Sequence, residues 1–347
     1  MTNRPRWEMG SSFPLTTGTG SEQALPFGAG SYFGSGRQAL TALVLHGRQE
    51  HGWRTLYVPT YYCPEVVDDL RRVTEVRRYR ASPEGDVAEP GADNRDAVLL
   101  ASYFGERPAQ VGLEAAARII DATHDPLATW LDGVNADYVV ASLRKTIPLP
   151  DGGMAWSPRG LSLPEPRPAG DRQLAGVGHM LSAMSLKSAY LAGKPIDKTA
   201  YLELFTLADR YFQDTEPGEM SPFSRSVLPT FPLQRWRQQR MDNIAAATVA
   251  LQGLSLVHVL PSTFGVVLRF ECHALREAVR SALIAQSIFP AVLWDLSNED
   301  VPEAHTQLAR RMLFVHADFR WTRADMDKAA RTVRMACAAF DREGITC

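Results

Sequence analysis

The sequence predicts an α/β protein: a three-layer large domain with a mostly parallel sheet, followed by a small C-terminal α+β domain. Two observations favour this fold class. Apolar runs such as VLLAS at 98–102 and YVVAS at 138–142 lack polar alternation, which is typical of strands buried on both faces. These runs alternate along the chain with segments of helical spacing, the order that generates parallel sheets. At 347 residues the chain is also long enough for a large core and a second, smaller one.

In the first half, each element follows from its local pattern. Residues 1–35, rich in Gly, Ser and Thr, read as an irregular N-terminal arm. Helices are expected at 37–52, at 64–73, where Pro64 suits a first helical position, and at 110–117. Strands are expected at 55–59, 74–80, 96–105, 118–125, 137–142 and 152–158. We therefore place the large domain at residues 36–190.

After Pro168 the pattern changes to long amphipathic helices, at 172–193, 197–213 and 232–253. Residues 191–250 are interpreted as a helical connection. Strands at 257–261, 264–270, 288–296 and 310–316, with helices at 275–286 and 323–340, then indicate a small α+β domain at 251–347.

Composition excludes several classes of function. The net charge of −2 leaves no broad basic face, so nucleic acid is not an expected partner. No stretch approaches 18 uncharged apolar residues, so no membrane partner is expected either. The four cysteines are far apart and form no CxxC pair, which favours a reducing compartment. We expect a cytoplasmic protein.

Polar side chains gather where the predicted strands end. Asp121 and His124 follow one strand, Ser142 and Lys145 follow another, and Tyr103 follows a third. Ligands of open α/β sheets bind at the carboxyl ends of the strands. A lysine there can form a Schiff base with an aldehyde, and an aspartate can keep a pyridine nitrogen protonated. The backbone N–H groups of Gly36 and Arg37 at a helix start, with the Ser142 hydroxyl, suit a phosphate.

In these stretches the chain resembles the fold-type I pyridoxal-phosphate (PLP) enzymes, specifically the DegT/StrS aminotransferase family. The resemblance is carried by SGRQAL at 35–40, VPTYYCPEV at 58–66, SYFGERPAQ at 102–110, DATHD at 121–125 and SLRKTIPLPDGG at 142–153. RQQRMDN at 237–243 and HADFRWTRADMDKAA at 316–330 resemble the family's small domain, so the likeness spans nearly the whole chain in order.

The resemblance implies a role for each matched residue. Lys145 would hold PLP as the internal aldimine and later carry the proton. Asp121 would pair with the pyridine nitrogen and His124 would contact the ring near O3′. The phosphate would be held by Gly36, Arg37 and Ser142.

The remaining site assignments keep alternatives open. Counting from the family pattern puts Cys63 where an aromatic usually stacks on the ring, so Tyr62 or Tyr61 would stack instead. Tyr103 and Arg320 are candidate substrate contacts, and a salt bridge with Asp318 or Asp325 is the structural alternative for Arg320. His316 and Asp318, two residues apart, are better explained by a strand than by a metal, and no metal is expected.

The function implied is a PLP-dependent aminotransferase acting on a small amino or carbonyl substrate in a secondary-metabolite or sugar pathway. Its partners would be an amino donor, a carbonyl acceptor and a second copy of the chain, in a homodimer with a shared active site. The spacing of three from Ser142 to Lys145 is shorter than in most sugar-nucleotide members. A PLP-dependent lyase, replacement or cyclisation enzyme is one alternative, and a non-catalytic scaffold with the same fold is another.

Overall fold

Seven strands form one sheet in the order β1-β7-β6-β5-β4-β2-β3. The computed structural model describes residues 4–10, 12–18, 29–109, 111–112, 116–213 and 216–342. The strands are β1 (Gly30–Phe33), β2 (Thr55–Pro59), β3 (Glu75–Tyr79), β4 (Asp96–Ala101), β5 (Ala117–Asp121), β6 (Tyr138–Ser142) and β7 (Gly153–Trp156). The five from β6 to β3 pair in parallel, and β7 and β1 join antiparallel. The mostly parallel sheet expected from the buried apolar runs is confirmed.

Both faces of this sheet are covered. Helices α1 (Gly36–Glu50) and α2 (Pro64–Arg71) pack on one face, where the apolar side of α1 contributes Leu40, Leu43 and Val44 to the core. Helix α1 begins at Ser35, whose hydroxyl accepts the Gln38 N–H at 3.2 Å. The opposite face packs against loops, the short helix α5 (Pro222–Val227) and the start of α6 (Leu233–Leu251).

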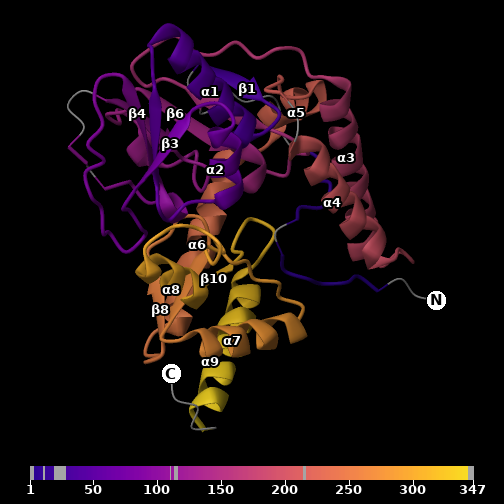
Figure 1. Cartoon of the computed structure of the whole chain (residues 1–347). Coiled ribbons are helices and arrows are strands. Elements are labelled where there is room, and N and C mark those ends of the chain that lie inside the picture. The colour runs from indigo at the N-terminus through magenta and orange to yellow at the C-terminus, as the bar shows by residue number, and fades with distance from the viewer. Residues whose placement is uncertain are drawn as a thin grey trace.

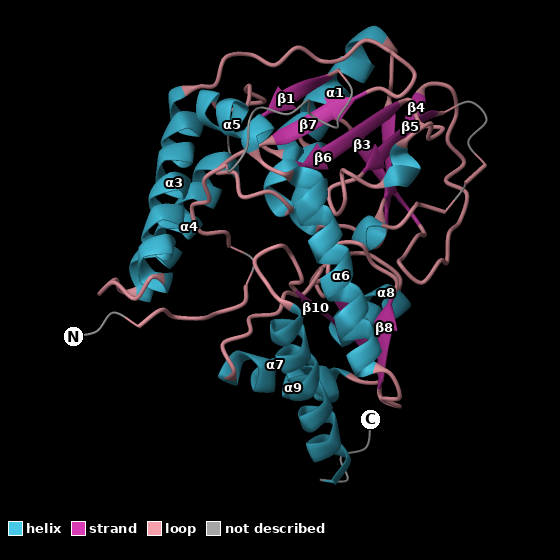
Figure 2. Cartoon of the chain, turned by 180° about the vertical axis from the view of Figure 1, so that it is seen from behind, coloured by secondary structure: helices cyan, strands magenta, loops and turns pink. Residues whose placement is uncertain are grey.

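Two long helices and the N-terminal segment flank the large domain. Helices α3 (Asp171–Leu191) and α4 (Lys198–Gln213) lie antiparallel beside the sheet (Figure 1). The described part of the arm passes between this hairpin and the small domain, which Figure 2 shows from behind. Phe13 in the arm packs into the same apolar cluster as Met184 and Phe212. The arm is therefore a packed element that links the hairpin to the rest of the molecule.

Helix α6 runs from the large domain into the small one (Figure 1). The small sheet has the antiparallel order β10-β9-β8, from β8 (Val257–Leu260), β9 (Val266–Phe270) and β10 (Met312–Val315). It is accompanied by α7 (His273–Ala285), α8 (Glu303–Arg311) and α9 (Arg323–Arg342). Short 3-10 turns complete the chain: η1 (Tyr103–Gly105), η2 (Thr129–Leu131), η3 (Leu143–Lys145) and η4 (Leu228–Thr230).

The structure differs from the sequence expectations at several elements. Gly30–Phe33 belongs to the large sheet as β1, so the arm ends before residue 35. Residues 288–296 form isolated bridges rather than a strand, because Pro290 has no N–H for a ladder. Helices α5 and α8 were not expected. The helix expected at 110–117 stays a prediction, because residues 110 and 113–115 lie outside those described. Within the described residues, no helix is long and apolar enough to cross a membrane.

Candidate active site

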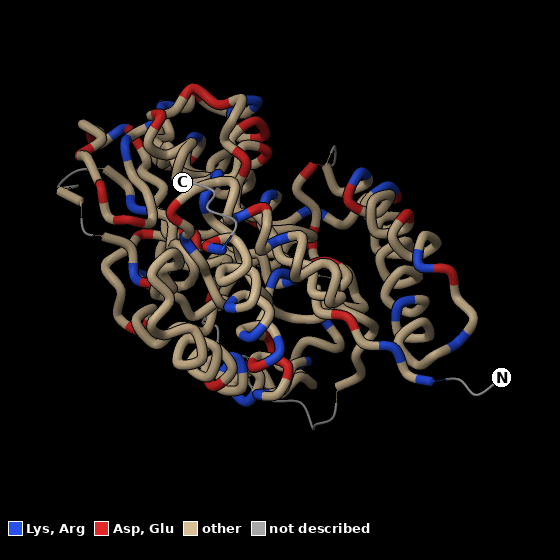
Figure 3. Tube along the Cα trace, turned by 90° about the horizontal axis from the view of Figure 1, so that it is seen from below, with Lys and Arg blue, Asp and Glu red and all other residues tan. Residues whose placement is uncertain are grey.

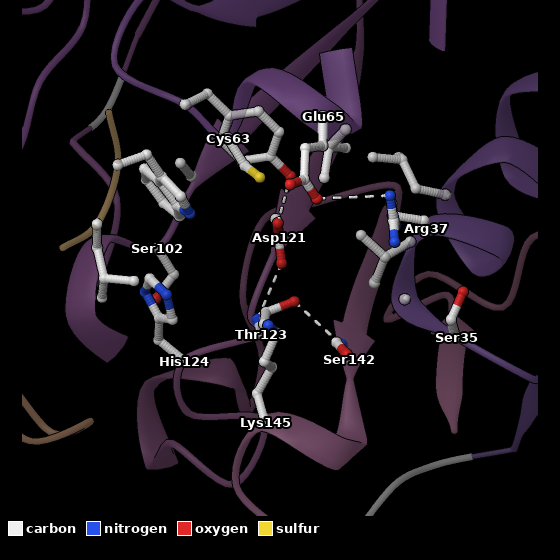
Figure 4. Close-up of a pocket in the computed structure, with 18 of the residues that line it drawn as sticks. Ser35, Arg37, Cys63, Glu65, Ser102, Asp121, Thr123, His124, Ser142 and Lys145 are labelled. Atoms are coloured by element: carbon white, nitrogen blue, oxygen red, sulfur yellow. Dashed lines mark hydrogen bonds and ion pairs between the residues drawn. The ribbon is translucent and has the colours of Figure 1, made fainter. Parts of the chain in front are cut away.

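A cavity of about 270 Å³ lies at the carboxyl ends of the parallel strands (Figure 4). Its lining comes from the turns after β2, β4, β5 and β6, from the start of α1, from the end of α4, and from two small-domain loops. The predicted residues that line it are Gly36, Arg37, Tyr62, Tyr103, Asp121, His124, Ser142 and Lys145. Residues from eight parts of the chain thus meet at one edge of the sheet, as open α/β folds favour.

The first turn of α1 approaches the end of β6 closely. A Cβ added at Gly36 would lie 2.6 Å from the Ser142 Cβ, so only glycine allows this contact. No acidic residue occupies the first turn of α1, and the helix start lies next to Ser142. A helix N-terminus with a neighbouring hydroxyl is a site that suits a phosphate group.

Asp121, the last residue of β5, lies at the centre of a short hydrogen-bond chain (Figure 4). Its Oδ1 accepts the Thr123 N–H at 2.9 Å, and its Oδ2 accepts the Tyr62 hydroxyl. The Thr123 hydroxyl in turn accepts the Ser142 N–H at 3.0 Å. Two donors leave further lone pairs on the carboxylate, so Asp121 is oriented and still able to accept a third donor.

Lys145 ends η3, and its side chain extends toward Thr123 and Asp121 (Figure 4). The side chain is reached from the cavity, yet protein surrounds the amine on most sides. Burial and, next, the charge of the neighbouring Arg144 lower the pKa of the Lys145 amine. A larger fraction of the amine is therefore uncharged at a given pH than for a lysine in water.

His124 follows β5 and stacks between aromatic rings, with Phe264 at 4.4 Å and Trp294 at 5.8 Å between centroids. Its Nδ1 accepts the Phe104 N–H at 3.0 Å, which requires the neutral ring to carry its proton on Nε2. Burial, followed by the charge of Lys145, lowers the pKa of His124 to about 3. His124 is thus a neutral hydrogen-bond donor at neutral pH.

The turn η1 holds the two walls of the cavity together. Phe104 adopts a left-handed conformation, with φ at 54°, which is strained for a residue with a Cβ. In that conformation its N–H binds His124, while its carbonyl accepts the N–H groups of Thr263 and Phe264 at 2.9 and 3.1 Å. A local strain in the large domain thereby fixes a small-domain loop against the site.

The residues considered for stacking on the cofactor ring occupy different positions in the structure. Tyr62 lines the cavity, with its hydroxyl on Asp121, and Cys63 lines it as well. Burial raises the pKa of the Cys63 thiol. Tyr61 is not among the cavity's described lining residues, and its hydroxyl donates to the Leu293 carbonyl at 2.7 Å. Tyr103 lines the cavity, but its hydroxyl donates to the Tyr61 carbonyl, also at 2.7 Å.

Arg320 lies apart from the cavity. Its Nε and Nη2 donate to the two oxygens of Asp318 at 2.6 and 2.7 Å, which is the salt bridge considered as its structural alternative. Its Nη1 and Nη2 also donate to the carbonyls of Ser12 and Gly10 in the arm, both at 2.8 Å. The guanidinium therefore ties the small domain to the arm.

Several lining residues were missed by the sequence analysis. Trp294 and Phe264 come from small-domain loops, and Asp209 and Gln213 from the end of α4. Arg144, next to Lys145, and Thr123, inside the DATHD motif, could have been found from their positions, whereas the others carry no local signal.

No protein-family model matches the chain, and no curated protein sequence matches it. Solved structures do match its fold. PseC of Helicobacter pylori, an aminotransferase involved in the biosynthesis of pseudoaminic acid, superposes with a TM-score of 0.63 at 10% identity, over 96% of this chain and 100% of that one. A sugar aminotransferase of Micromonospora echinospora gives 0.58 at 13% identity, over 88% and 87%. A DegT/DnrJ/EryC1/StrS aminotransferase of Brucella abortus gives 0.58 at 14%, over 90% and 86%.

The chain has the fold of these sugar aminotransferases. The residues of its cavity fit PLP on observations of this structure. The Gly36 cradle, which a Cβ would fill, suits the phosphate, and the Asp121 carboxylate suits the ring nitrogen. The Lys145 amine suits the aldehyde. In this aminotransferase fold, therefore, each group that PLP needs has a partner in one cavity.

Proposed function

We propose that this protein is a PLP-dependent aminotransferase that acts on a small amino or carbonyl substrate in a biosynthetic pathway. One observation carries the proposal: an amine, a carboxylate and a helix N-terminus with a hydroxyl line the same cavity, from Lys145, Asp121, Gly36 and Ser142. Each could serve another purpose alone, but together they match the aldehyde, ring nitrogen and phosphate of one cofactor. The fold shared with sugar aminotransferases supports a sugar pathway.

The residues divide the work of the reaction. PLP, when bound, supplies an electron sink for the negative charge that develops at the substrate's α-carbon. Asp121, held by Thr123 and Tyr62, keeps a proton on the ring nitrogen, because a carboxylate favours the positive form. Lys145 would be the residue that anchors the cofactor through its aldehyde carbon, and its amine would act as the general base for the proton on the substrate's α-carbon.

The low pKa of Lys145 suits both tasks, since only the uncharged amine attacks a carbonyl or accepts a proton. His124, with its proton on Nε2, would donate a hydrogen bond to the O3′ oxygen of the cofactor. The rings of Trp294 and Phe264 cover this side of the cavity and exclude water. As part of the same proposal, we expect a homodimer in which a second copy of the chain completes the site.

The visible spectrum of the purified protein tests this function. With PLP added, the wild type should show a yellow band that borohydride reduces to a permanent covalent adduct, and Lys145→Ala should show no adduct. Lys194→Ala, which removes an exposed lysine, is the matched control and should behave as the wild type. A protein that takes up no PLP would contradict the proposal.

An amino donor then distinguishes transamination from elimination. Transamination predicts that the donor removes the yellow band and that only a carbonyl acceptor restores it. A band that returns without an acceptor, with release of ammonia, would favour a lyase instead.

A further inference from the structure

Three cationic side chains line the cavity: Arg37, Arg144 and Lys145. Lys145 is assigned to the cofactor in the proposed function. The Arg37 guanidinium is shared between two carboxylates of α2, Glu65 at 3.6 Å and Asp69 at 3.4 Å. Arg144 is therefore the cation whose role at the site remains to be explained.

Arg144 uses little of its hydrogen-bonding capacity. Its Nη2 donates to the Asp209 Oδ1 of α4 at 3.2 Å, a single contact rather than the two-pronged pairing that a guanidinium favours. Its Nε is buried without a hydrogen-bond partner among the described residues. Arg320 provides the contrast, because its guanidinium donates to both carboxylate oxygens of Asp318.

The Asp209 partner is easy to displace. Its side chain is 49% exposed, against 19% for Arg144, so the Asp209 carboxylate faces solvent at the rim of the cavity. An ion pair with one partner so exposed contributes little to stability. A bound anion with two oxygens would engage more of the guanidinium than Asp209 does.

The positive charge of Arg144 also lowers the pKa of the Lys145 amine. Arg144 is the residue just before Lys145, and its charge is the main cause, after burial, of the lowered pKa of that amine. A cation held so close to the reacting amine is well placed for an anionic part of the substrate.

We propose that Arg144 binds an anionic group of the substrate, a carboxylate or a phosphate, and that Asp209 is the partner which this group displaces. This inference rests on the proposed function in that it names a chemical class for the substrate of the same cavity. It assigns to Arg144 a substrate contact of the kind for which the sequence analysis considered Arg320.

Titration calorimetry tests the proposal on the PLP-loaded protein, in which the phosphate cradle is already filled. The probes are succinate, inorganic phosphate and uncharged succinamide. We expect the wild type to bind at least one of the two anions but not succinamide. Arg144→Gln should weaken the binding of that anion at least about tenfold. Arg144→Lys should weaken it less, because lysine keeps the positive charge but lacks the two-pronged hydrogen bonding of a guanidinium. Asp209→Asn should strengthen the binding of the anion about threefold, because the carboxylate that competes with it for Arg144 is removed.

Arg210→Gln is the matched control, since it removes a positive charge from the same helix at a residue outside the cavity lining. It should leave the dissociation constant within about twofold. Whichever anion depends on Arg144 identifies the group as carboxylate or phosphate. Equal affinities for the wild type, Arg144→Gln and Asp209→Asn, or no anion binding by the wild type, would overturn the inference.

Two further readouts separate this inference from the proposed function. The reduced Lys145 adduct should still form in Arg144→Gln, while the KM of the amino donor or carbonyl acceptor rises more than kcat falls.

If the wild type takes up no PLP, the proposed function fails. The succinate titration on cofactor-free protein then still decides the role of Arg144, because its pair with Asp209 is present without cofactor.

Discussion

Single side chains at the strand ends set the chemistry of the cavity through burial and neighbouring charge. His124 is kept neutral by its aromatic surroundings and by Lys145, and His316 in the small domain is kept neutral by burial and, next, by Arg320. In both cases the folded protein disfavours the charged ring. The state of these groups is thus a property of their environment rather than of the residue type.

The two histidines predict a loss of stability in mild acid. Their pKa falls from 6.5 to about 3 on folding, so below pH 6.5 the unfolded chain binds protons that the fold does not. The free energy of unfolding is at its full value with respect to these two groups above about pH 6.5, and it decreases as the pH falls toward 3. Each group should give a slope of up to about 1.4 kcal/mol per pH unit. Urea unfolding of the cofactor-free protein between pH 6.5 and 5 measures it.

His124→Gln and His316→Gln provide the check. Each single variant should remove the contribution of one histidine to the pH dependence of the unfolding free energy. The double variant should remove both contributions. A slope that stays at its wild-type value in both single variants would show that these rings are charged in the fold.

Two elements, α1 and β6, form the proposed phosphate site because they touch without an intervening side chain. The contact depends on Gly36, and the same crowding recurs at Gly153, where a Cβ would lie 2.1 Å from the Ser35 carbonyl oxygen. Glycines on both sides therefore allow the start of α1 to lie against the sheet edge. The close approach, rather than any charge, defines this end of the cavity.

Gly36→Ala tests that requirement. The added methyl group meets Ser142 at 2.6 Å, so α1 must move, and we expect PLP affinity to fall at least tenfold. Equilibrium dialysis against PLP measures the loss. Gly178→Ala in α3 is the matched control, because nothing lies within 4 Å of its added Cβ. It should keep its affinity and gain about 0.5–1 kcal/mol of stability, as alanine does in an exposed helix. Equal affinities in the two variants would be inconsistent with a cradle at Gly36.

At the scale of the whole molecule, the cavity depends on how the two domains are joined. Asp125, next to His124, is fully buried and accepts hydrogen bonds from Arg237 at 2.9 Å and Arg240 at 2.8 Å, both on α6. The tie anchors the connecting helix to the turn that carries the site. Elsewhere basic and acidic residues are interspersed along the chain, as Figure 3 shows from below. The domain contact thus combines this buried ion-pair tie with an apolar cluster that joins Tyr61 and Phe104 of the large domain to Phe314 of the small one.

Asp125→Asn should destabilise the protein by about 3–5 kcal/mol, because it leaves two buried guanidinium groups without their counter-charge. Asp93→Asn weakens an ion pair with Arg54 in which both side chains are about half exposed, and should change the stability far less than Asp125→Asn does. Urea unfolding of both variants compares the two costs. Similar values would mean that the domains are held together by apolar contacts alone.

The sequence by itself determined the fold class and the residues closest to the proposed chemistry. Strands and helices follow from periodicity, and Gly36, Asp121, Ser142 and Lys145 sit where such elements begin or end, so topology brings them together. The tertiary structure alone decided which distant groups join them. Trp294 lies in an irregular segment that reads as a strand, and the partner of Arg320 was one of several alternatives. Contacts of this kind depend on how the domains pack, and local sequence patterns do not encode that packing.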